Sequence, residues 1–162
     1  LHEVVDHGTT IVVRARNRDV IKPAAWSIGM GAEGVLIGTR VLVAEEVWSH
    51  PEVKKQVVNA GAADSTLVMA SFRNTSRVMI NEYALEVQKL EDEGIEDFEQ
   101  YWDYVKGSNA FDAYKSGDWN KALLSMGQAA AFANTIVPME EIFDTLIDEA
   151  TGAIERISSL TQ

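Results

Sequence analysis

The pattern of apolar and polar positions changes character near residue 44. Before that point, short β-branched runs alternate with polar segments, and residues 10–15 (TIVVRA) and 34–40 (GVLIGTR) are predicted to form strands. The second run is apolar throughout its centre, which is typical of a strand buried on both faces. Residues 23–30 are predicted to form a short helix with proline in its first turn. This order predicts a βαβ unit with a right-handed crossover.

After residue 44 the spacing of apolar residues mainly predicts helices. Residues 49–51 (SHP) are typical of a helix start, and this helix is expected to end near residue 59. Residues 66–71 (TLVMAS) are predicted to be extended, and residues 74–76 (NTS) are candidate caps for the next helix. That helix has one apolar face, formed by Ile80, Tyr83, Val87 and Leu90.

The last third of the chain carries an aromatic stripe and a long amphipathic pattern. Six aromatic side chains are expected to be core residues, with a lid that lines a cavity as the alternative: Phe98, Tyr101, Trp102, Tyr104, Phe111 and Tyr114. Small residues at 125–131 would let a helix over residues 119–134 approach a neighbour or a ligand closely, and helix packing is the favoured interpretation. Pro138 opens the last predicted helix.

Composition narrows the classes of function. The chain has 162 residues, enough for one domain with a core, and a net charge of -11. This charge argues against nucleic acid or an anionic membrane as a partner, because both attract basic surfaces. There is no cysteine and the three histidines lie far apart, so disulfides and a histidine-rich metal site are not expected. No apolar run approaches membrane-spanning length, and we expect a cytoplasmic protein.

The exit of the predicted strand at residues 34–40 is the main candidate site. Gly38 lets the backbone approach a ligand closely, Thr39 adds a hydroxyl and Arg40 adds a positive charge. Backbone N–H groups, a hydroxyl and a cation together suit a phosphate group. From the residues alone, a core strand that ends in an ordinary turn is the favoured interpretation.

A second cationic cluster follows the first predicted strand. Arg14, Arg16 and Arg18 alternate there and could hold an anion, although a solvated loop is the favoured interpretation. The sequence contains no nucleophile elbow, no Walker loop and no GxGxxG fingerprint. We therefore assign no catalytic residue and no metal ligand from the sequence.

Several of these segments, in this order, resemble one family. Residues 29–46 (GMGAEGVLIGTRVLVAEE) are similar to the last barrel strand and its flanks in the nitronate monooxygenases, formerly called 2-nitropropane dioxygenases. The related FMN-dependent enoyl-acyl-carrier-protein reductases share this pattern. Further similar segments follow in the family's order: His50-Pro51 with Lys54, residues 71–74 (SFRN) with Arg77, Val78 and Asn81, Gly117-Asp118, residues 125–128 (SMGQ) and the closing helix at residues 136–149. The resemblance covers residues 29–157.

The resemblance implies an α/β fold that is mostly helical. Residues 1–45 would supply the last βαβ portion of a TIM-like (β/α)8 barrel. Residues 46–162 would form a helical lid domain whose C-terminal helix packs back on the barrel. The FMN phosphate would be bound by Leu36, Ile37, Gly38 and Thr39. Gly127 and Gln128 would approach the flavin side of the pocket.

The chain also departs from the family pattern. The family has a Gly-Gly turn that supplies the other half of the phosphate site, whereas residues 20–27 (VIKPAAWS) contain no glycine. The family's catalytic histidine lies in an earlier barrel segment, in a motif that surrounds neither His2 nor His7. His50 is expected to be structural. A TIM barrel needs about 250 residues, so this chain cannot build one alone.

The resemblance implies an FMN-dependent oxidoreductase that oxidises small nitronate or carbanion-like substrates with oxygen, this chain being an incomplete C-terminal part. Within the family, the alternative is an FMN-dependent enoyl reductase. A third interpretation is a catalytically inactive helical module that binds no flavin and pairs with other molecules through its small sheet. The expected partners are a small-molecule substrate and either a second copy or the remainder of a longer chain. The remainder of a longer chain is considered because the sequence begins with Leu1 and not with methionine.

Overall fold

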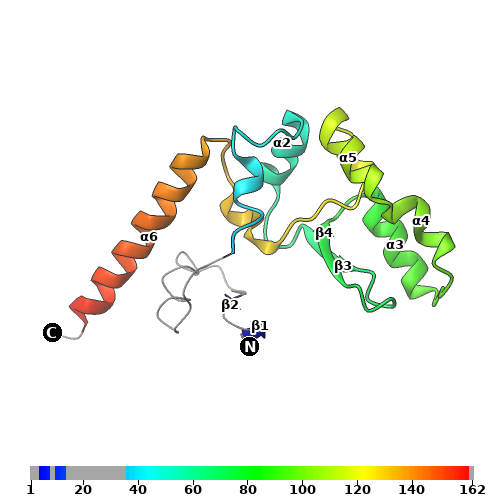
Figure 1. Cartoon of the computed structure of the whole chain (residues 1–162), viewed down its shortest axis with the longest axis horizontal. Helices are drawn as coiled ribbons and strands as arrows, with labels where there is room; N and C mark the ends of the chain where they lie inside the picture. The colour runs from blue at the N-terminus through cyan, green and yellow to red at the C-terminus, as the bar shows by residue number, and fades with distance from the viewer. Residues whose placement is uncertain (1–3, 8–9, 14–35, 161–162) are drawn as a thin grey trace. The chain divides into compact units, whose positions relative to one another are not determined.

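A computed structural model describes residues 4–7, 10–13 and 36–160 of the chain, which divides into two compact units. One unit comprises Leu1–Ile37 with Pro138–Gln162, and the other is Gly38–Val137. Figure 1 labels the elements along the chain. In chain order they are β1 (Val4–His7), β2 (Thr10–Val13), η1 (Val41–Val43), α2 (Pro51–Asn59), β3 (Ser65–Val68), β4 (Ser76–Met79), α3 (Glu82–Asp92), α4 (Glu99–Val105), α5 (Gly107–Ser116), η2 (Trp119–Lys121), η3 (Gln128–Phe132) and α6 (Met139–Ser159).

The first unit contains an antiparallel hairpin where a parallel strand was predicted. β2 confirms the strand at residues 10–15 in part, but it pairs antiparallel with β1, so that Val4 lies opposite Val13. No strand was predicted at Val4–His7. Two short strands joined by a two-residue connection can satisfy each other's backbone groups locally, which a distant parallel partner cannot do. The predicted helix at residues 23–30 and the cluster of Arg14, Arg16 and Arg18 lie outside the described residues.

The predicted strand at residues 34–40 is wrong over the part that the structure describes. Leu36 and Ile37 have no regular secondary structure, and the side chain of Leu36 is 81% exposed. A strand forms only where a neighbouring strand accepts and donates its backbone hydrogen bonds. Among the described residues, strands pair only as β1 with β2 and β3 with β4, so this apolar run has no such neighbour there.

The second unit is built around the antiparallel pair β3–β4. Ser65 lies opposite Met79 at one end of the pair, and Val68 lies opposite Ser76 at the other. A third segment extends this sheet, because the Met79 N–H donates to the Leu124 carbonyl at 2.9 Å and Ser125 forms a bridge with Val78. The prediction of an extended segment at residues 66–71 is thus confirmed in part, whereas β4 replaces the predicted helix caps at 74–76.

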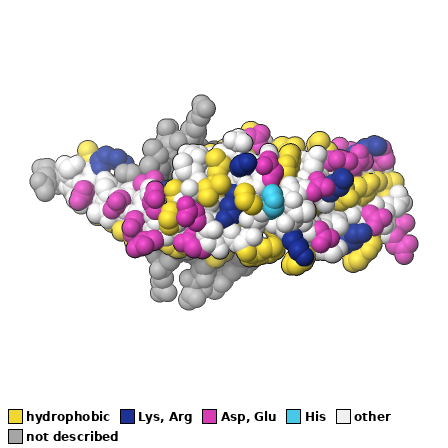
Figure 2. Space-filling model, turned by 90° about the horizontal axis from the view of Figure 1, so that it is seen from above, with side chains coloured by type: hydrophobic (Ala, Val, Ile, Leu, Met, Phe, Trp, Pro, Cys, Tyr) yellow, Lys and Arg dark blue, Asp and Glu magenta, His cyan; other side chains and the backbone are white. Residues whose placement is uncertain are grey.

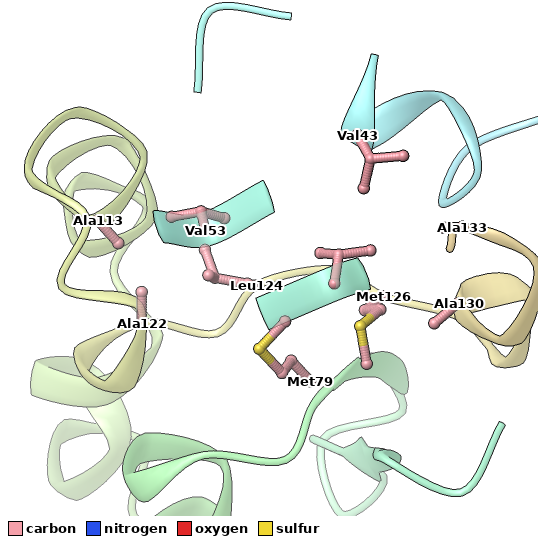
Figure 3. Packing of buried hydrophobic residues seen from close by; sticks show 10 residues of the cluster. Val43, Val53, Met79, Ala113, Ala122, Leu124, Met126, Ala130 and Ala133 are labelled. Carbon is pink, nitrogen blue, oxygen red and sulfur yellow. The ribbon is translucent and has the colours of Figure 1, made fainter. Parts of the chain in front are cut away.

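This small sheet separates two hydrophobic cores. Side chains of neighbouring residues in a strand point to opposite faces, so Met79 and Leu124 enter the first core while Val78 and Leu123 enter the second. Figure 3 shows the first core, which includes the side chains of Met79, Leu124 and Met126. The buried residues of the second core are Val68, Met69, Val78, Ala84, Val87 and Tyr101. Both cores lie within Gly38–Val137.

The aromatic stripe is only partly a core feature. Tyr101 is fully buried, its hydroxyl donates to the Ile95 carbonyl at 2.8 Å, and its ring lies 4.9 Å from that of Phe72. In contrast, Phe98, Trp102 and Phe111 are exposed. The prediction that all six aromatic side chains are buried is therefore wrong for these three, because α4 and α5 are short and each turns only one side to a core.

The helix predictions from residue 49 onward have mixed outcomes. α2 is confirmed, with His50 as its cap, and α3 begins after Asn81, whose side chain accepts from the Ala84 N–H at 2.9 Å. The helix over residues 119–134 is wrong: this segment contains two short 3-10 turns joined by the extended run that pairs with β4. The segment Ser125–Met126 is extended and not helical because it pairs with β4 and adds a third segment to the sheet between the two cores.

The last helix, α6, is confirmed and carries acidic residues in its first turn. Its exposed large apolar side chains are Phe143, Ile147, Ile154 and Ile157. Figure 2 shows acidic side chains spread over this helix and over the region of α3 and α4, in keeping with the net charge of -11. Within the described part of the chain, every helix is too short or too polar to cross a membrane.

Candidate functional site

The Gly38–Thr39 turn leads directly into η1. The Val41 N–H donates to the Gly38 carbonyl at 3.1 Å, and the Leu42 N–H donates to the Thr39 carbonyl at 3.2 Å. These bonds use the carbonyl groups of the turn. The N–H groups of Gly38 and Thr39 donate to no acceptor within the described residues. Two consecutive free N–H groups beside a hydroxyl are suited to hold an anion.

The hydroxyl of Thr39 joins this turn to the segment around Gly127. The Gly127 N–H donates to Thr39 Oγ1 at 2.9 Å, across a separation of 88 residues. A side chain at position 127 would lie close to this contact, because its Cβ would be 3.4 Å from Thr39 Oγ1. A threonine hydroxyl that accepts one bond still has its own proton to donate. The contact therefore fixes the hydroxyl and leaves its O–H available.

Four of the six residues predicted to bind FMN lie in the Gly38–Val137 unit. Gly38, Thr39 and Gly127 are linked by the turn and the hydrogen bond, and Gln128 follows Gly127 as the first residue of η3. The Gln128 side chain is exposed and makes no hydrogen bond in the part of the chain that the structure describes. Leu36 and Ile37 belong to the other unit, so their role in binding FMN stays a prediction.

Gly38 has open space where a side chain would begin. A Cβ built on Gly38 meets no atom of the described residues within 4 Å, so this part of the structure does not require a glycine at this position. A ligand that approaches the backbone there would require one, because a methyl group would occupy the same space. The free N–H groups, the Thr39 hydroxyl and this open space fit a phosphate group.

A buried lysine that was not predicted to belong to the site supports the chain just after the turn. Lys54 is 6% exposed, and its ammonium group donates to the carbonyls of Ala44 and Glu45 at 2.6 and 3.1 Å. The Glu45 N–H in turn donates to the Val137 carbonyl at 3.0 Å. The sequence signal for this role is the position of Lys54 between Val53 and Val57, which are both buried in α2. A lysine on a buried face needs hydrogen-bond acceptors, so this position predicts that Lys54 binds backbone or side-chain oxygens.

His50 is structural, as expected, and lies next to α5. Its Nδ1 accepts the Glu52 N–H at 3.1 Å, and its backbone N–H donates to the Tyr114 carbonyl at 2.7 Å. Burial raises the pKa of Tyr114, and burial also raises the pKa of Tyr101. In the described residues, no cluster of three or more histidine, aspartate or glutamate side chains could hold a metal ion.

Comparison with known proteins places this geometry in a family. A model described as nitronate monooxygenase matches residues 18–149. Among solved structures, FabK from Thermotoga maritima is similar at 25% identity with a TM-score of 0.76, over 84% of this chain and 42% of that one. The enoyl reductase domain of MlnA from Bacillus amyloliquefaciens has a TM-score of 0.64 at 13% identity, over 84% of this chain and 46% of that domain, and shows likeness of fold alone.

A local likeness to another protein covers a smaller share of the chain. UvrABC system protein A from Xylella fastidiosa is 46% identical over 54 residues, which is 32% of this chain and 6% of that protein. The nitronate monooxygenase model extends over more than half of the chain and is therefore the more informative match. This chain spans less than half of the FabK chain, so the activity, substrates and partners of a whole protein are matters for proposal.

Proposed function

Because the chain belongs to the nitronate monooxygenase family, we propose that it contributes the phosphate-binding turn of an FMN-dependent oxidoreductase. The observation that carries this proposal is the hydrogen bond from the Gly127 N–H to Thr39 Oγ1. It joins two segments that the family resemblance implicates in FMN binding and that are far apart in the sequence. The assignment of residues 1–45 to a barrel and of residues 46–162 to a lid domain remains part of the proposal.

The N–H groups of Gly38 and Thr39 and the Thr39 hydroxyl would donate hydrogen bonds to phosphate oxygens. All three donors are free in the described part of the chain, and donors of this kind stabilise a negatively charged group. Backbone groups of Leu36 and Ile37 would complete this side of the site, and Gly127 with Gln128 would border the flavin. When bound, the flavin supplies the redox chemistry, and the protein binds and orients it.

Two substrate classes follow from the family and its structural relatives. The first is a small nitronate or carbanion-like compound oxidised with oxygen, as the family's description indicates. The second is an enoyl thioester, supported by the likeness to FabK at 25% identity. Two assays separate these classes. Oxygen consumption with the anion of a small nitroalkane would support the first class. Oxidation of a nicotinamide nucleotide with a short enoyl thioester would support the second.

The cofactor proposal is tested by titrating the chain with FMN and following flavin absorbance and fluorescence after desalting. Gly38→Ala should weaken FMN binding at least about tenfold, because the added methyl occupies the space beside the free N–H groups. Gly61→Ala is the matched control, since its Cβ meets its nearest atom, Asp64 Oδ2, at an ordinary 3.5 Å.

Equal FMN binding by the Gly38→Ala variant and the native chain would contradict the assigned turn. A complete absence of flavin binding by the native chain would instead favour the third interpretation, a helical module without a flavin. In that case the chain should self-associate, and sedimentation measurements should detect the association.

A further inference from the structure

We propose that a second site in the Gly38–Val137 unit binds a nucleotide through its base and its phosphate. The site is a cavity of about 320 Å³ between the β4 sheet and the corner where α4 meets α5. It shares no residue with the Thr39–Gly127 contact. The proposal goes beyond the FMN turn and does not depend on it.

One wall of the cavity is aromatic. Phe98 and Trp102 line it, their ring centroids lie 6.3 Å apart, and they are 43% and 54% exposed. These two rings occupy successive turns of the chain around α4, so they form one apolar surface. A planar ring placed on it would be stabilised by stacking, as bases are at single-stranded nucleic acid sites.

The cavity is also lined by polar residues that have unused hydrogen-bonding groups. Asn74, Ser76 and Ser125 line the cavity, and their side chains make no hydrogen bond within the described residues. An alkyl chain in this space would remove water from these groups without replacing their hydrogen bonds. The cavity is also lined by the apolar residues Met69, Val78, Val105 and Leu123. A nucleobase has apolar faces and carries donors and acceptors at its edge, so a lining of both kinds favours a base over an acyl chain.

The cavity lining also includes a cation. Lys106 lines the cavity and donates to Asp103 Oδ1 at 2.9 Å, which uses one of its three N–H donors. The next residue, Gly107, also lines the cavity, and a Cβ built there meets no atom of the described part of the chain within 4 Å. A phosphate has room to approach Lys106 at this point, with Asp103 as the competing anion.

The sheet keeps this cavity apart from the first core. Ser125 lines the cavity, whereas the neighbouring Leu124 and Met126 are buried in the first core on the opposite face. Substitutions of residues that line the cavity can therefore be made without removing side chains from that core. This allows binding to be tested separately from the integrity of the first core.

The test is calorimetric titration of the full chain with AMP, adenosine and inorganic phosphate. Trp102→Leu should weaken both AMP and adenosine about tenfold or more. Lys106→Gln should weaken AMP about fivefold and leave adenosine unchanged, because only AMP carries the phosphate. Trp48→Leu and Lys115→Gln, an exposed tryptophan and an exposed lysine outside the cavity, are the matched controls and should bind normally.

If Trp102→Leu does not fold, Asn74→Ala provides a second test of the same site. This variant should fold, because Asn74 is exposed and its side chain has no hydrogen bond in the described structure. It should weaken adenosine and AMP to the same extent. The proposal is overturned if the native chain binds neither compound at millimolar concentration. It is also overturned if inorganic phosphate binds as well as AMP, or if the control variants lose binding as much as the cavity variants.

Discussion

Gly117 ends α5 in the left-handed region of backbone conformation, at φ 86°, directly against the ring of His50. A Cβ at this position would overlap the imidazole atoms of His50, which is held in place as the cap of α2. Gly117→Ala should therefore lower the free energy of unfolding by at least about 2 kcal/mol, from backbone strain and overpacking together. Urea denaturation followed by circular dichroism measures this change.

The control for this substitution is Gly94→Ala. Gly94 also has a positive φ, 71°, but a Cβ built there meets no atom within 4 Å. Gly94→Ala should lower the free energy of unfolding only through backbone strain, by about 1 kcal/mol. If the two variants unfold at the same urea concentration, the overlap with His50 contributes nothing to stability.

The burial of Tyr101 should make the folded chain less stable at high pH. Burial raises its pKa above the ordinary value of 10.0, and the same holds for Tyr114. Above pH 10 the unfolded chain loses these phenol protons while the folded chain keeps them, so the free energy of unfolding should fall as pH rises further. The urea midpoint measured from pH 8 to 11 should show this decline.

A variant with phenylalanine at positions 101 and 114 separates this effect from general alkaline damage. It should be less stable at pH 8 by about 1 kcal/mol, because the bond from Tyr101 to the Ile95 carbonyl is lost. Its decline above pH 10 should be shallower than that of the native chain. Parallel declines would show that the two tyrosines do not cause the effect.

At the scale of elements, Glu91 connects α3 to the turn between β3 and β4. Its carboxylate accepts the N–H groups of Met69 and Ser71 at 2.9 and 3.0 Å and the Ser71 hydroxyl at 2.9 Å. This turn contains Met69 and Arg73 at positive φ, so it needs external support. Glu91→Gln should lower the free energy of unfolding by about 1–2 kcal/mol, because hydrogen bonds to a charged group are replaced by weaker ones.

Hydrogen exchange locates this loss in the turn. The amides of Met69 and Ser71 should exchange faster in Glu91→Gln, while those of α2 should keep their protection. Glu93→Gln, a substitution of an exposed acid at the end of the same helix, should leave both sets unchanged. Faster exchange throughout the unit would argue against a local anchor.

Elements with a local signal could be predicted from the sequence, and elements that depend on distant partners could not. Pro51 and Pro138 mark the starts of α2 and α6 through their own backbone restriction, and both helices form. β4 was missed because its polar residues resemble helix caps, and only pairing with β3 and Leu124 makes it a strand. For the candidate site, the sequence indicated Gly38, Thr39 and Gly127 as site residues. It could not predict the hydrogen bond between Gly127 and Thr39, because that bond depends on the fold.

At the scale of the whole molecule, both hydrophobic cores belong to the Gly38–Val137 unit. A polypeptide of these residues should fold alone, because it retains every buried residue of the two cores. We expect a cooperative urea transition and a circular dichroism spectrum with helical signal. A gradual loss of signal without a cooperative transition would show that the rest of the chain is required.

The hydrogen bond between Thr39 and Gly127 closes a loop of 88 residues, and this has a consequence for the order of folding. Contacts between such distant positions carry a loop-closure cost, so the intervening sheet and helices are expected to form first. Thr39→Val should then speed unfolding and hardly change the refolding rate. The proposed phosphate turn would be completed last on the folding pathway and would open first.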